Sequence, residues 1–571
     1  MSKKEAVNIL NEIATLLELS GADFFKVRAY NNGARAIESS DITIDQNTTA
    51  KELSNIKGIG KAIAQKLEEF LSTGKMKYYE ELKASIPSGL MDMLKIPGLG
   101  PKKIKYLYEE LGITTIRELE FECQENFLID LPGFGKKTQD NILKGIEVVK
   151  RFQGNFLYGE IIGQAENLIG EIKGSKKVIR ASLAGSIRRK KETVKDIDIV
   201  ASSKDHDSLM NFFTTRECVM DVISRGDTKS SIRLESGIAV DIRVVDDDQY
   251  PYALHHFTGS KEHNTAMRSI AKKNKIKMNE YGLFKEDKLI RCKDEAHIFS
   301  QFGMDYIEPE LRENFGEIEA ARDKKLPDLV GISDIEGLLH IHTDFSDGSM
   351  SASQVVEYME SKDFSYVGFS EHSIAAQYAG GLNNDTVHEY FDALDALQKK
   401  HSIKILKGIE SDIMPDGSLD FDDGILSLFD FVIISVHTGF NMDEEKMTDR
   451  IIKAMDNKYA TILAHPTGRI LLAREPYKIN IIKVIEAAAE KGVFIEINAN
   501  PFRLDLDWRY CKQAKEAGAK FLINPDAHNL EGLSDYTYGV NTARKGWLEK
   551  QDILNTYPVK KLEELLKSRK E

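Results

Sequence analysis

The 571-residue sequence predicts a multidomain protein with an all-α N-terminal region, a mixed α/β middle and a C-terminal parallel α/β sheet or barrel. Residues 1–150 have a helical apolar period, short glycine-containing turns and few β-branched runs. From about residue 151, strand-like segments such as VIRASLAGS, KDIDIVAS and IAVDIRVVD mix with helices. Beyond residue 336, seven apolar runs alternate with helical segments, which is typical of parallel α/β folds.

Composition restricts the setting in which the protein works. No apolar run reaches the roughly 18 residues of a membrane span, so no membrane association is expected. The first residues, MSKKEAVNILNEIATLLEL, predict an amphipathic helix rather than a signal peptide. The 4 cysteines are scattered and form no CxxC pair, which favours a reducing cytoplasm. We expect a monomer, because nothing in the sequence indicates an obligate oligomer.

The net charge of −13 is unevenly distributed. Residues 1–325 hold 51 Lys+Arg and 51 Asp+Glu, whereas residues 326–571 hold 27 and 40. This balance argues against a protein that coats nucleic acid through charge alone, but local contacts through backbone amides remain open. The acidic C-terminal excess is what a cation-binding site needs.

Three similar turns occur in the helical region, in IKGIGKAIAQKL (56–67), IPGLGPKKIKYL (96–107) and LPGFGKKTQDNIL (131–143). Two glycines around an apolar residue allow close backbone approach, and the following helix presents unpaired N–H groups that favour a phosphate. One copy is equally well explained by a connection without ligand, but three copies favour sequence-independent DNA binding. They resemble helix-hairpin-helix motifs. The candidate DNA-binding residues are Gly58, Gly60, Lys61, Gly98, Gly100, Lys102, Gly133, Gly135 and Lys136.

A cluster of carboxylates is predicted in LAGSIRRKKETVKDIDIVAS (183–202) and AVDIRVV. Asp196 and Asp198 project from one face of a strand, and Asp241 joins them if its strand pairs alongside. Three clustered carboxylates repel one another unless cations neutralise them, which predicts two Mg²⁺ ions and phosphoryl transfer. A lone DxD would more often be an exposed strand edge, but the preceding element favours a triphosphate site. That element consists of Gly185, Ser186, Arg188 and Arg189.

Residues 1–315 resemble a family X DNA polymerase. The resemblance rests on GSIRR and DIDIV of the nucleotidyltransferase palm, on HFTGSKEHNTAMRSIA (256–271) and on KMNEYGLF (277–284). It implies template-directed filling of short gaps in base excision repair, with gapped or nicked DNA, dNTPs and Mg²⁺. The implied metal ligands are the three aspartates, and the implied nucleotide-binding residues are Gly185, Ser186, Arg189, Phe257, Gly259, Asn264 and Arg268.

The sequence departs from vertebrate members of that family at three positions. His256 stands where they have tyrosine, which bears on ribonucleotide exclusion. Lys195 stands where they have glycine and Ala239 where they have arginine, which bears on fidelity and rate. Because the catalytic carboxylates are intact, we expect an active polymerase.

The same family resemblance aligns Lys66, in GIGKAIAQKLEEFL, with a lysine that forms a Schiff base with an abasic sugar. Such a 5′-deoxyribose phosphate lyase needs a depressed lysine pKa, so that the neutral amine is the nucleophile. A surface lysine without this role is the commoner case.

Metal-binding side chains follow most of the seven apolar runs after residue 336. Six of the 13 histidines lie at or just past predicted strand ends, which converge at one mouth in a barrel. Six histidines with three carboxylates predict a cluster of two or three metal ions, and mixed nitrogen and oxygen ligands suit Mn²⁺, Zn²⁺ or iron. The candidate ligands are His340, His342, Asp347, His372, Glu410, His437, His465, Asp526 and His528.

This half resembles the polymerase and histidinol phosphatase (PHP) domain, a distorted (β/α)7 barrel. The resemblance implies one metal on His340, His342, Glu410 and Asp526, a second on Glu410, His437 and His465, and a third on Asp347, His372 and His528. It also implies that Asn498 and Arg503 hold a substrate phosphate, and that Glu371 supports the ligands from behind. The implied reaction is phosphoester hydrolysis: a 3′→5′ exonuclease that also cleans blocked 3′ ends, and cleavage at abasic sites.

The leading hypothesis is therefore a bifunctional repair polymerase and 3′ nuclease. One alternative is a polymerase whose barrel is a structural or DNA-positioning module without hydrolytic activity. Another is a small-molecule phosphatase fused to a DNA-binding front end. The expected domains are a helical DNA-binding domain (1–90), a helix-hairpin-helix subdomain (91–150), the palm (151–245), a nucleotide-pocket subdomain (246–316), a linker (317–335) and the PHP domain (336–571).

Overall fold

A computed structural model describes residues 3–38, 44, 48–96, 98–129, 131–150 and 154–570. The chain forms two compact units. The first, here called the helical unit, comprises Met1–Gln124 and Leu128–Val149. The second, here called the two-sheet unit, comprises Glu125–Phe127 and Lys150–Glu571. Within the described ranges, no helix is both long and apolar enough to span a membrane.

The helical unit is all-α, as predicted. Along α4, the side chains of Ile63, Leu67 and Leu71 are buried, because residues four apart share one helix face. They pack in a core with Leu10 and Ile13 of α1. The helices are α1 (Lys3–Leu19), α2 (Phe24–Glu38), α3 (Ala50–Ser54), α4 (Lys61–Thr73), α5 (Lys77–Ala84), α6 (Ser88–Met93), α7 (Pro101–Leu111), α8 (Ile116–Gln124) and α9 (Gly135–Lys150).

A five-stranded sheet begins the two-sheet unit, in the strand order β2-β4-β7-β6-β5. The three predicted strands are the neighbours β2, β4 and β7, while β5 and β6 extend the sheet beyond the sequence prediction. Ile197 and Ile199 of β4 are buried with the apolar side chains of α10 and α12. The elements are α10 (Tyr158–Gly174), β2 (Arg180–Leu183), α11 (Gly185–Arg188), β4 (Asp196–Ser202), α12 (His206–Thr214), β5 (Val219–Arg225), β6 (Lys229–Leu234) and β7 (Ala239–Val245), with β1 (Phe156–Leu157) paired to β3 (Thr193–Val194).

A smaller subdomain follows, and it extends into the predicted linker. Residues 317–322 form α16, whose Ile318 and Ala321 are buried in an apolar cluster with Met267 of α14. Glu317 is also buried and lies 2.7 Å from Nδ1 of His263. The apolar face of α16 therefore makes the start of the linker part of a packed core. The other elements are α13 (Tyr250–Thr258), α14 (Lys261–Lys273), the antiparallel strands β8 (Lys277–Asn279), β9 (Gly282–Lys285) and β10 (Lys288–Ile290), and α15 (Glu295–Ser300).

The C-terminal half is a seven-stranded parallel barrel, which confirms the predicted fold class. Every predicted apolar run contains one strand, and the strands lie in sequence order. A parallel bridge between Ile341 and Ala527 joins the first and last strand segments and closes the sheet. The strands are β11 (Gly337–Leu338), β12 (Tyr366–His372), β13 (Lys404–Asp412), β14 (Phe431–Ser435), β15 (Ile462–Leu463), β16 (Phe494–Asn498) and β17 (Phe521–Asn524).

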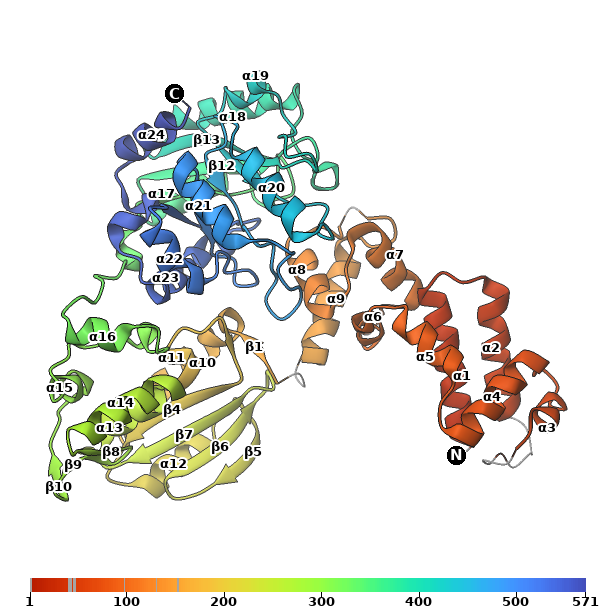
Figure 1. Cartoon of the computed structure of the whole chain (residues 1–571), viewed down its shortest axis with the longest axis horizontal. Coiled ribbons are helices and arrows are strands. Elements are labelled where there is room, and N and C mark those ends of the chain that lie inside the picture. Colours follow the sequence, from red (N-terminus) through yellow and green to blue (C-terminus); the bar gives the residue numbers. More distant parts are fainter. Residues whose placement is uncertain are drawn as a thin grey trace. The chain divides into compact units, whose positions relative to one another are not determined.

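Helices cover the outside of the barrel, in green to blue in Figure 1. They are α17 (Ala352–Ser361), α18 (Thr386–Gln398), α19 (Asp423–Leu426), α20 (Glu444–Ala454), α21 (Ile481–Lys491), α22 (Trp508–Glu516), α23 (Tyr536–Lys545) and α24 (Val559–Ser568). Leu562 and Leu566 of α24 pack with Leu339, Leu406 and Phe431, which lie in the strands or next to them. This apolar packing leaves the opposite, C-terminal strand ends for the polar residues.

Two glycines make room for one aromatic ring in the barrel. A Cβ atom on either Gly368 or Gly408 would overlap the Phe431 ring, and one on Gly408 would also lie 2.7 Å from the Phe369 carbonyl oxygen. Phe431 is fully buried. Gly408 is therefore required by packing rather than by backbone conformation.

Gly408→Ala is expected to lower the free energy of unfolding by about 1–3 kcal/mol, because the added methyl group overpacks a filled interior. Scanning calorimetry of the barrel transition measures this loss. Gly532→Ala is the matched control, since its Cβ would meet its nearest neighbour at an ordinary 3.5 Å. An unchanged transition for Gly408→Ala would contradict the packing described for the barrel.

Candidate active sites

The three predicted aspartates of the five-stranded sheet lie together. Asp196 and Asp198 alternate with buried Ile197 on β4, and Asp198 pairs in register with Asp241 on the parallel neighbour β7. The predicted pairing of these strands is therefore confirmed. Asp241 also accepts a hydrogen bond of 2.6 Å from the Ser231 hydroxyl, and Lys229 Nζ lies 2.5 Å from its other oxygen. Ser231 and Lys229, on β6, were missed because their strand was not predicted.

The three aspartate carboxylates repel one another. Burial, together with Asp196 and Asp241, raises the pKa of Asp198 to about 7. Burial and Asp241 also raise the pKa of Asp196, with Lys229 and Lys195 opposing the shift. Divalent cations would remove this repulsion, so the donor set fits the predicted Mg²⁺ ions.

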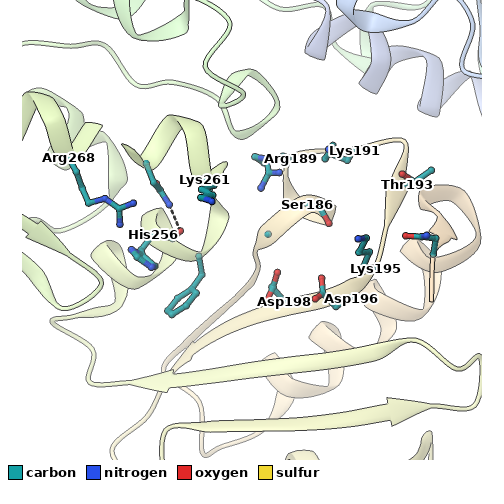
Figure 2. Close-up of a pocket in the computed structure, with 15 residues that line it drawn as sticks. Ser186, Arg189, Lys191, Thr193, Lys195, Asp196, Asp198, His256, Lys261 and Arg268 are labelled. Carbon is teal, nitrogen blue, oxygen red and sulfur yellow. Dashed lines mark hydrogen bonds between the residues drawn. The ribbon is translucent and has the colours of Figure 1, made fainter. Parts of the chain in front are cut away.

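A pocket of about 560 Å³ opens at these aspartates (Figure 2). Asp196 and Asp198 lie on one side of it, with Ser186 and Arg189 above them in this view. All seven predicted nucleotide-binding residues line the pocket: Gly185, Ser186, Arg189, Phe257, Gly259, Asn264 and Arg268. Lys191, Lys195 and Lys261 add positive charge, which suits a triphosphate.

Gly185 is needed for two reasons. Its φ of +57° lies in the left-handed region, and a Cβ there would overlap the Asp198 carboxylate, with Cγ at 2.9 Å. The backbone thus passes directly over a candidate metal ligand. A side chain at this position would displace Asp198 from its neighbours.

The two arginines of GSIRR have different partners. Arg188 forms a two-pronged ion pair with Glu295, at 3.1 and 2.5 Å, and it does not line the pocket. Arg189 lines the pocket, while Nη1 donates to the Thr258 carbonyl oxygen at 2.6 Å. The positive charge that both arginines were expected to offer a triphosphate therefore comes from Arg189 alone.

His256 faces the same pocket. Its carbonyl oxygen accepts a hydrogen bond of 2.7 Å from the Asn264 side chain, which joins α13 to α14. Burial is the main cause that lowers the pKa of His256, with Arg268 and Arg243 adding to the effect and Glu280 opposing it. A neutral imidazole thus occupies the position that departs from the vertebrate pattern.

In the helical unit, Lys66 lies between two tyrosine rings. Its Nζ donates to the Tyr30 hydroxyl at 2.7 Å and lies 3.4 Å from the centroid of the Tyr78 ring. Burial, and then the charge of Lys26, lower the pKa of Lys66, and Glu69 only partly opposes this. This environment favours the neutral amine that a Schiff-base nucleophile requires.

The three glycine turns share one conformation at their first glycine. Gly58, Gly98 and Gly133 have φ of +106°, +83° and +84°. A Cβ on the second glycine of each turn would meet no described atom within 4 Å. The helices α4, α7 and α9 begin at these turns with Lys61, Lys102 or Lys136 in the first turn. The space beside the second glycine of each turn is therefore open, and DNA binding by these turns stays a prediction.

The nine predicted ligands of the barrel form one cluster centred on Glu410. Its carboxylate oxygens lie 3.1–3.5 Å from ring nitrogens of five histidines. These histidines are His340, His342, His372, His437 and His465. Burial alone would raise the pKa of Glu410, but His437, His340 and His372 outweigh burial and hold it well below its ordinary value.

Two further carboxylates complete the cluster. Asp526 lies 3.3 Å from His340 and 3.4 Å from His342. Asp347 lies 3.4 Å from His372 and 3.5 Å from His528. The predicted ligands thus lie in one cluster, but their donor atoms group in part differently from the three predicted sets. Donor atoms that lie within 4.8 Å of one another form the groups His342–Asp347–His372–His528, His340–His342–Asp526 and His372–Glu410–His437.

The donor atoms fit metal binding. Although these side chains are buried, several of their polar atoms have no hydrogen-bond partner within the described part of the chain. Such atoms are costly to bury unless a ligand satisfies them. They are His340 Nε2, both ring nitrogens of His342 and His372, His528 Nε2 and Asp347 Oδ2.

Comparison with known proteins agrees with both halves. Residues 1–76 match a helix-hairpin-helix domain, 90–147 a SAM-like helix-hairpin-helix tandem, 253–313 the DNA polymerase beta thumb and 339–500 the PHP domain. The "DNA polymerase/3′-5′ exonuclease PolX" of Bacillus subtilis is 37% identical over 99% of this chain and 100% of its own length. The chain belongs to the family X DNA polymerases that carry a PHP domain. The predicted family is therefore confirmed.

Other relatives match only part of this family X polymerase. A probable phosphatase of Thermoanaerobacter sp. is 35% identical over 32% of this chain and 76% of its own length. A probable phosphatase of Caldanaerobacter subterraneus is 32% identical over 29% of this chain and 68% of its own length.

Two buried acids that the sequence did not reveal, Glu496 and Asp412, contact candidate metal-binding histidines of the polymerase. Glu496 accepts from His340 Nδ1 at 2.6 Å and from the His465 amide at 3.2 Å. Asp412 lies 3.0 Å from His437 Nδ1. Glu371 accepts from the Thr343 amide and hydroxyl, as expected of a residue behind the ligands. Such partners fix ring orientation and tautomer.

The two residues predicted to hold a substrate phosphate lie at the same mouth. Both N–H groups of the Asn498 side chain are engaged, with Glu496 at 3.0 Å and Asp526 at 2.9 Å. A contact with phosphate would require one of them to be released. Arg503 Nε lies 3.7 Å from Asp526, so its charge is close to the cluster.

Glu496→Gln is expected to weaken Mn²⁺ binding by the barrel about 10–100-fold, because His340 loses its anionic partner. Equilibrium dialysis with metal analysis measures the affinity. Glu486→Gln, an exposed glutamate on α21, is the control and should bind as the wild type does. Equal Mn²⁺ affinities for the two variants would show that Glu496 does not support the site.

Proposed function

We propose that this polymerase fills short gaps in DNA during base excision repair and processes DNA 3′ ends with its PHP domain. The observation that carries the proposal is that one chain holds two complete donor sets. Three aspartates lie at a basic pocket, and nine candidate ligands lie at the barrel mouth. The name of the Bacillus subtilis relative, which joins a polymerase and a 3′-5′ exonuclease, supports the pairing.

For synthesis, Asp196, Asp198 and Asp241 would hold Mg²⁺, which neutralises negative charge as the primer oxygen attacks a dNTP in line. Ser186 and Arg189 bind the triphosphate, with close backbone approach at Gly185. Phe257 and Gly259 lie against the sugar, while Asn264 and Arg268 line the base and template side. All of these residues line the pocket except Asp241, which pairs with Asp198.

For hydrolysis, the nine barrel residues would hold two or three Mn²⁺ or Zn²⁺ ions, which would supply activation of water and positive charge for the leaving 3′ oxygen. Arg503 would add a charge-assisted bond to the substrate phosphate. The proposed reactions are 3′→5′ exonuclease cleavage, removal of blocked 3′ ends and cleavage at abasic sites. The buried Glu496 and Asp412 keep the ligand rings in place.

The helical unit would bind gapped or nicked DNA through its three glycine turns. Lys66 would act there as a 5′-deoxyribose phosphate lyase nucleophile, supported by its lowered pKa. The proposal keeps the expected order of domains, with a DNA-binding front end, a palm and pocket that begin at 151 and include α16, and the barrel from 336. We also propose that the protein is a monomer in the cytoplasm.

Asp196→Ala should reduce dNTP incorporation on a gapped duplex to background while leaving 3′ degradation intact, because it removes a ligand of one site alone. The combined His340→Ala and His342→Ala variant should do the reverse. Gel analysis of a labelled duplex measures both activities. Asp221→Ala and His388→Ala, at exposed positions, are the matched controls.

Two results would contradict these assignments. Continued synthesis by Asp196→Ala would remove the palm site from the proposal. Continued 3′ degradation by the double histidine variant would leave the barrel as a structural or DNA-positioning module.

Borohydride should trap a covalent adduct between Lys66 and a 5′-deoxyribose phosphate substrate. Because the pKa of Lys66 is lowered, the yield should rise at a pH below the value of about 10.4 typical of lysine. Lys66→Ala should abolish the adduct, whereas Lys51→Ala, at an exposed lysine of α3, should keep it. An adduct that persists in Lys66→Ala would place the nucleophile elsewhere.

A further inference from the structure

A lysine of the barrel lies against the nucleotide pocket of the same unit. Lys545 ends helix α23, whose Val540 and Ala543 are buried in the barrel core. The Lys545 side chain is only 1% exposed. The aliphatic chain and the ammonium group of Lys545 therefore lie at a buried junction between the barrel and the preceding subdomain.

All three N–H groups of Lys545 can be accounted for. Nζ donates to the Arg189 carbonyl oxygen at 3.1 Å and to the Glu310 carbonyl oxygen at 3.3 Å. It donates to Glu313 Oε1 at 2.6 Å. Lys545 thus contacts both the backbone of Arg189 and the Glu313 carboxylate, to which the Arg189 side chain also donates.

Glu313 is shared between the barrel and the pocket. The same oxygen, Oε1, accepts from Arg189 Nε at 3.1 Å. Burial alone would raise the pKa of Glu313, but Lys545 and Arg189 outweigh it and keep the carboxylate ionised. Without Lys545, the buried carboxylate would have Arg189 as its remaining cationic partner.

Arg189 is held at three points by these contacts. Besides Glu313 and Lys545, it donates from Nη1 to the Thr258 carbonyl, next to Gly259. Its third nitrogen, Nη2, has no hydrogen-bond partner among the residues that the structure describes. The side chain lines the pocket beside Ser186 (Figure 2). The arrangement leaves Nη2 for an anionic ligand.

We propose that Lys545 is a positioning residue for nucleotide binding: it holds Glu313 and the Arg189 backbone so that the Arg189 guanidinium faces the triphosphate. The inference rests on the proposed synthesis of DNA at this pocket. It makes the barrel a working part of the polymerase, independent of any hydrolysis at the barrel mouth.

Lys545→Met, in the full-length protein, should raise the KM for dNTP about tenfold with kcat changed less than about threefold, because a buried charged hydrogen bond is lost. Degradation of 3′ ends should stay unchanged, since no nuclease ligand is touched. Lys512→Met is the matched control. Lys512 lies at the same junction, but its Nζ lies over the Trp547 and Phe315 rings.

A double-variant comparison separates positioning from general damage. Arg189→Ala should itself raise the KM, and adding Lys545→Met should then raise it little further, because both act through one guanidinium. Two effects that simply multiply would overturn the inference. If Lys545→Met yields no folded protein, Lys545→Gln is tested in the same way, and an unchanged KM would overturn the inference equally.

Measurements on the wild-type protein distinguish a failure of the proposed function from a failure of this inference. Absence of dNTP incorporation by the wild type would reject synthesis at the pocket. Normal wild-type synthesis with an unchanged KM in Lys545→Met would reject only the role of Lys545.

Discussion

The PHP site depends on the Glu410 carboxylate, which lies within 3.5 Å of five histidine rings. These rings lie at or just past the ends of the strands β11, β12, β14 and β15, and the bridge between Ile341 and Ala527 brings Asp526 and His528 to the same place. A buried carboxylate among five imidazole rings is stable when metal cations lie between the carboxylate oxygens and the ring nitrogens. The barrel, its filled interior and its supporting acids can all be understood as the means of holding this one arrangement.

The same constraint governs the palm on a smaller scale. Asp198 faces Asp241 across two parallel strands, and the pKa of Asp198 rises to about 7. Both sites gather carboxylates that cations would neutralise. In the palm the carboxylates repel one another, whereas in the barrel the histidines hold the pKa of Glu410 well below its ordinary value. The two sites differ in their surroundings: the palm opens to a basic pocket, whereas six of the nine candidate donors in the barrel are imidazoles. That difference suits nucleotide binding in one case and hydrolysis in the other.

Short-range patterns predicted most of this structure. Strand alternation predicted that Asp196 and Asp198 share a face, and the histidines after apolar runs predicted the barrel mouth. Long-range pairing explains what was missed. Glu496 lies within an apolar strand run, and only the closure of the barrel places it behind His340. Arg188 and Arg189 are adjacent in sequence, yet only the fold shows that Arg188 pairs with Glu295 and does not line the pocket. The polar sequence of β6 hid Lys229 and Ser231, and α16 was hidden within an expected linker.

The central claim is that one chain both extends and shortens a DNA 3′ end. The most direct measurement is incubation of the wild-type protein with a gapped duplex labelled on its primer strand, with and without dNTPs, in Mg²⁺ or Mn²⁺. The account predicts primer extension to the end of the gap when dNTPs are present and stepwise shortening when they are absent. A primer that is extended but never shortened in either metal would contradict it.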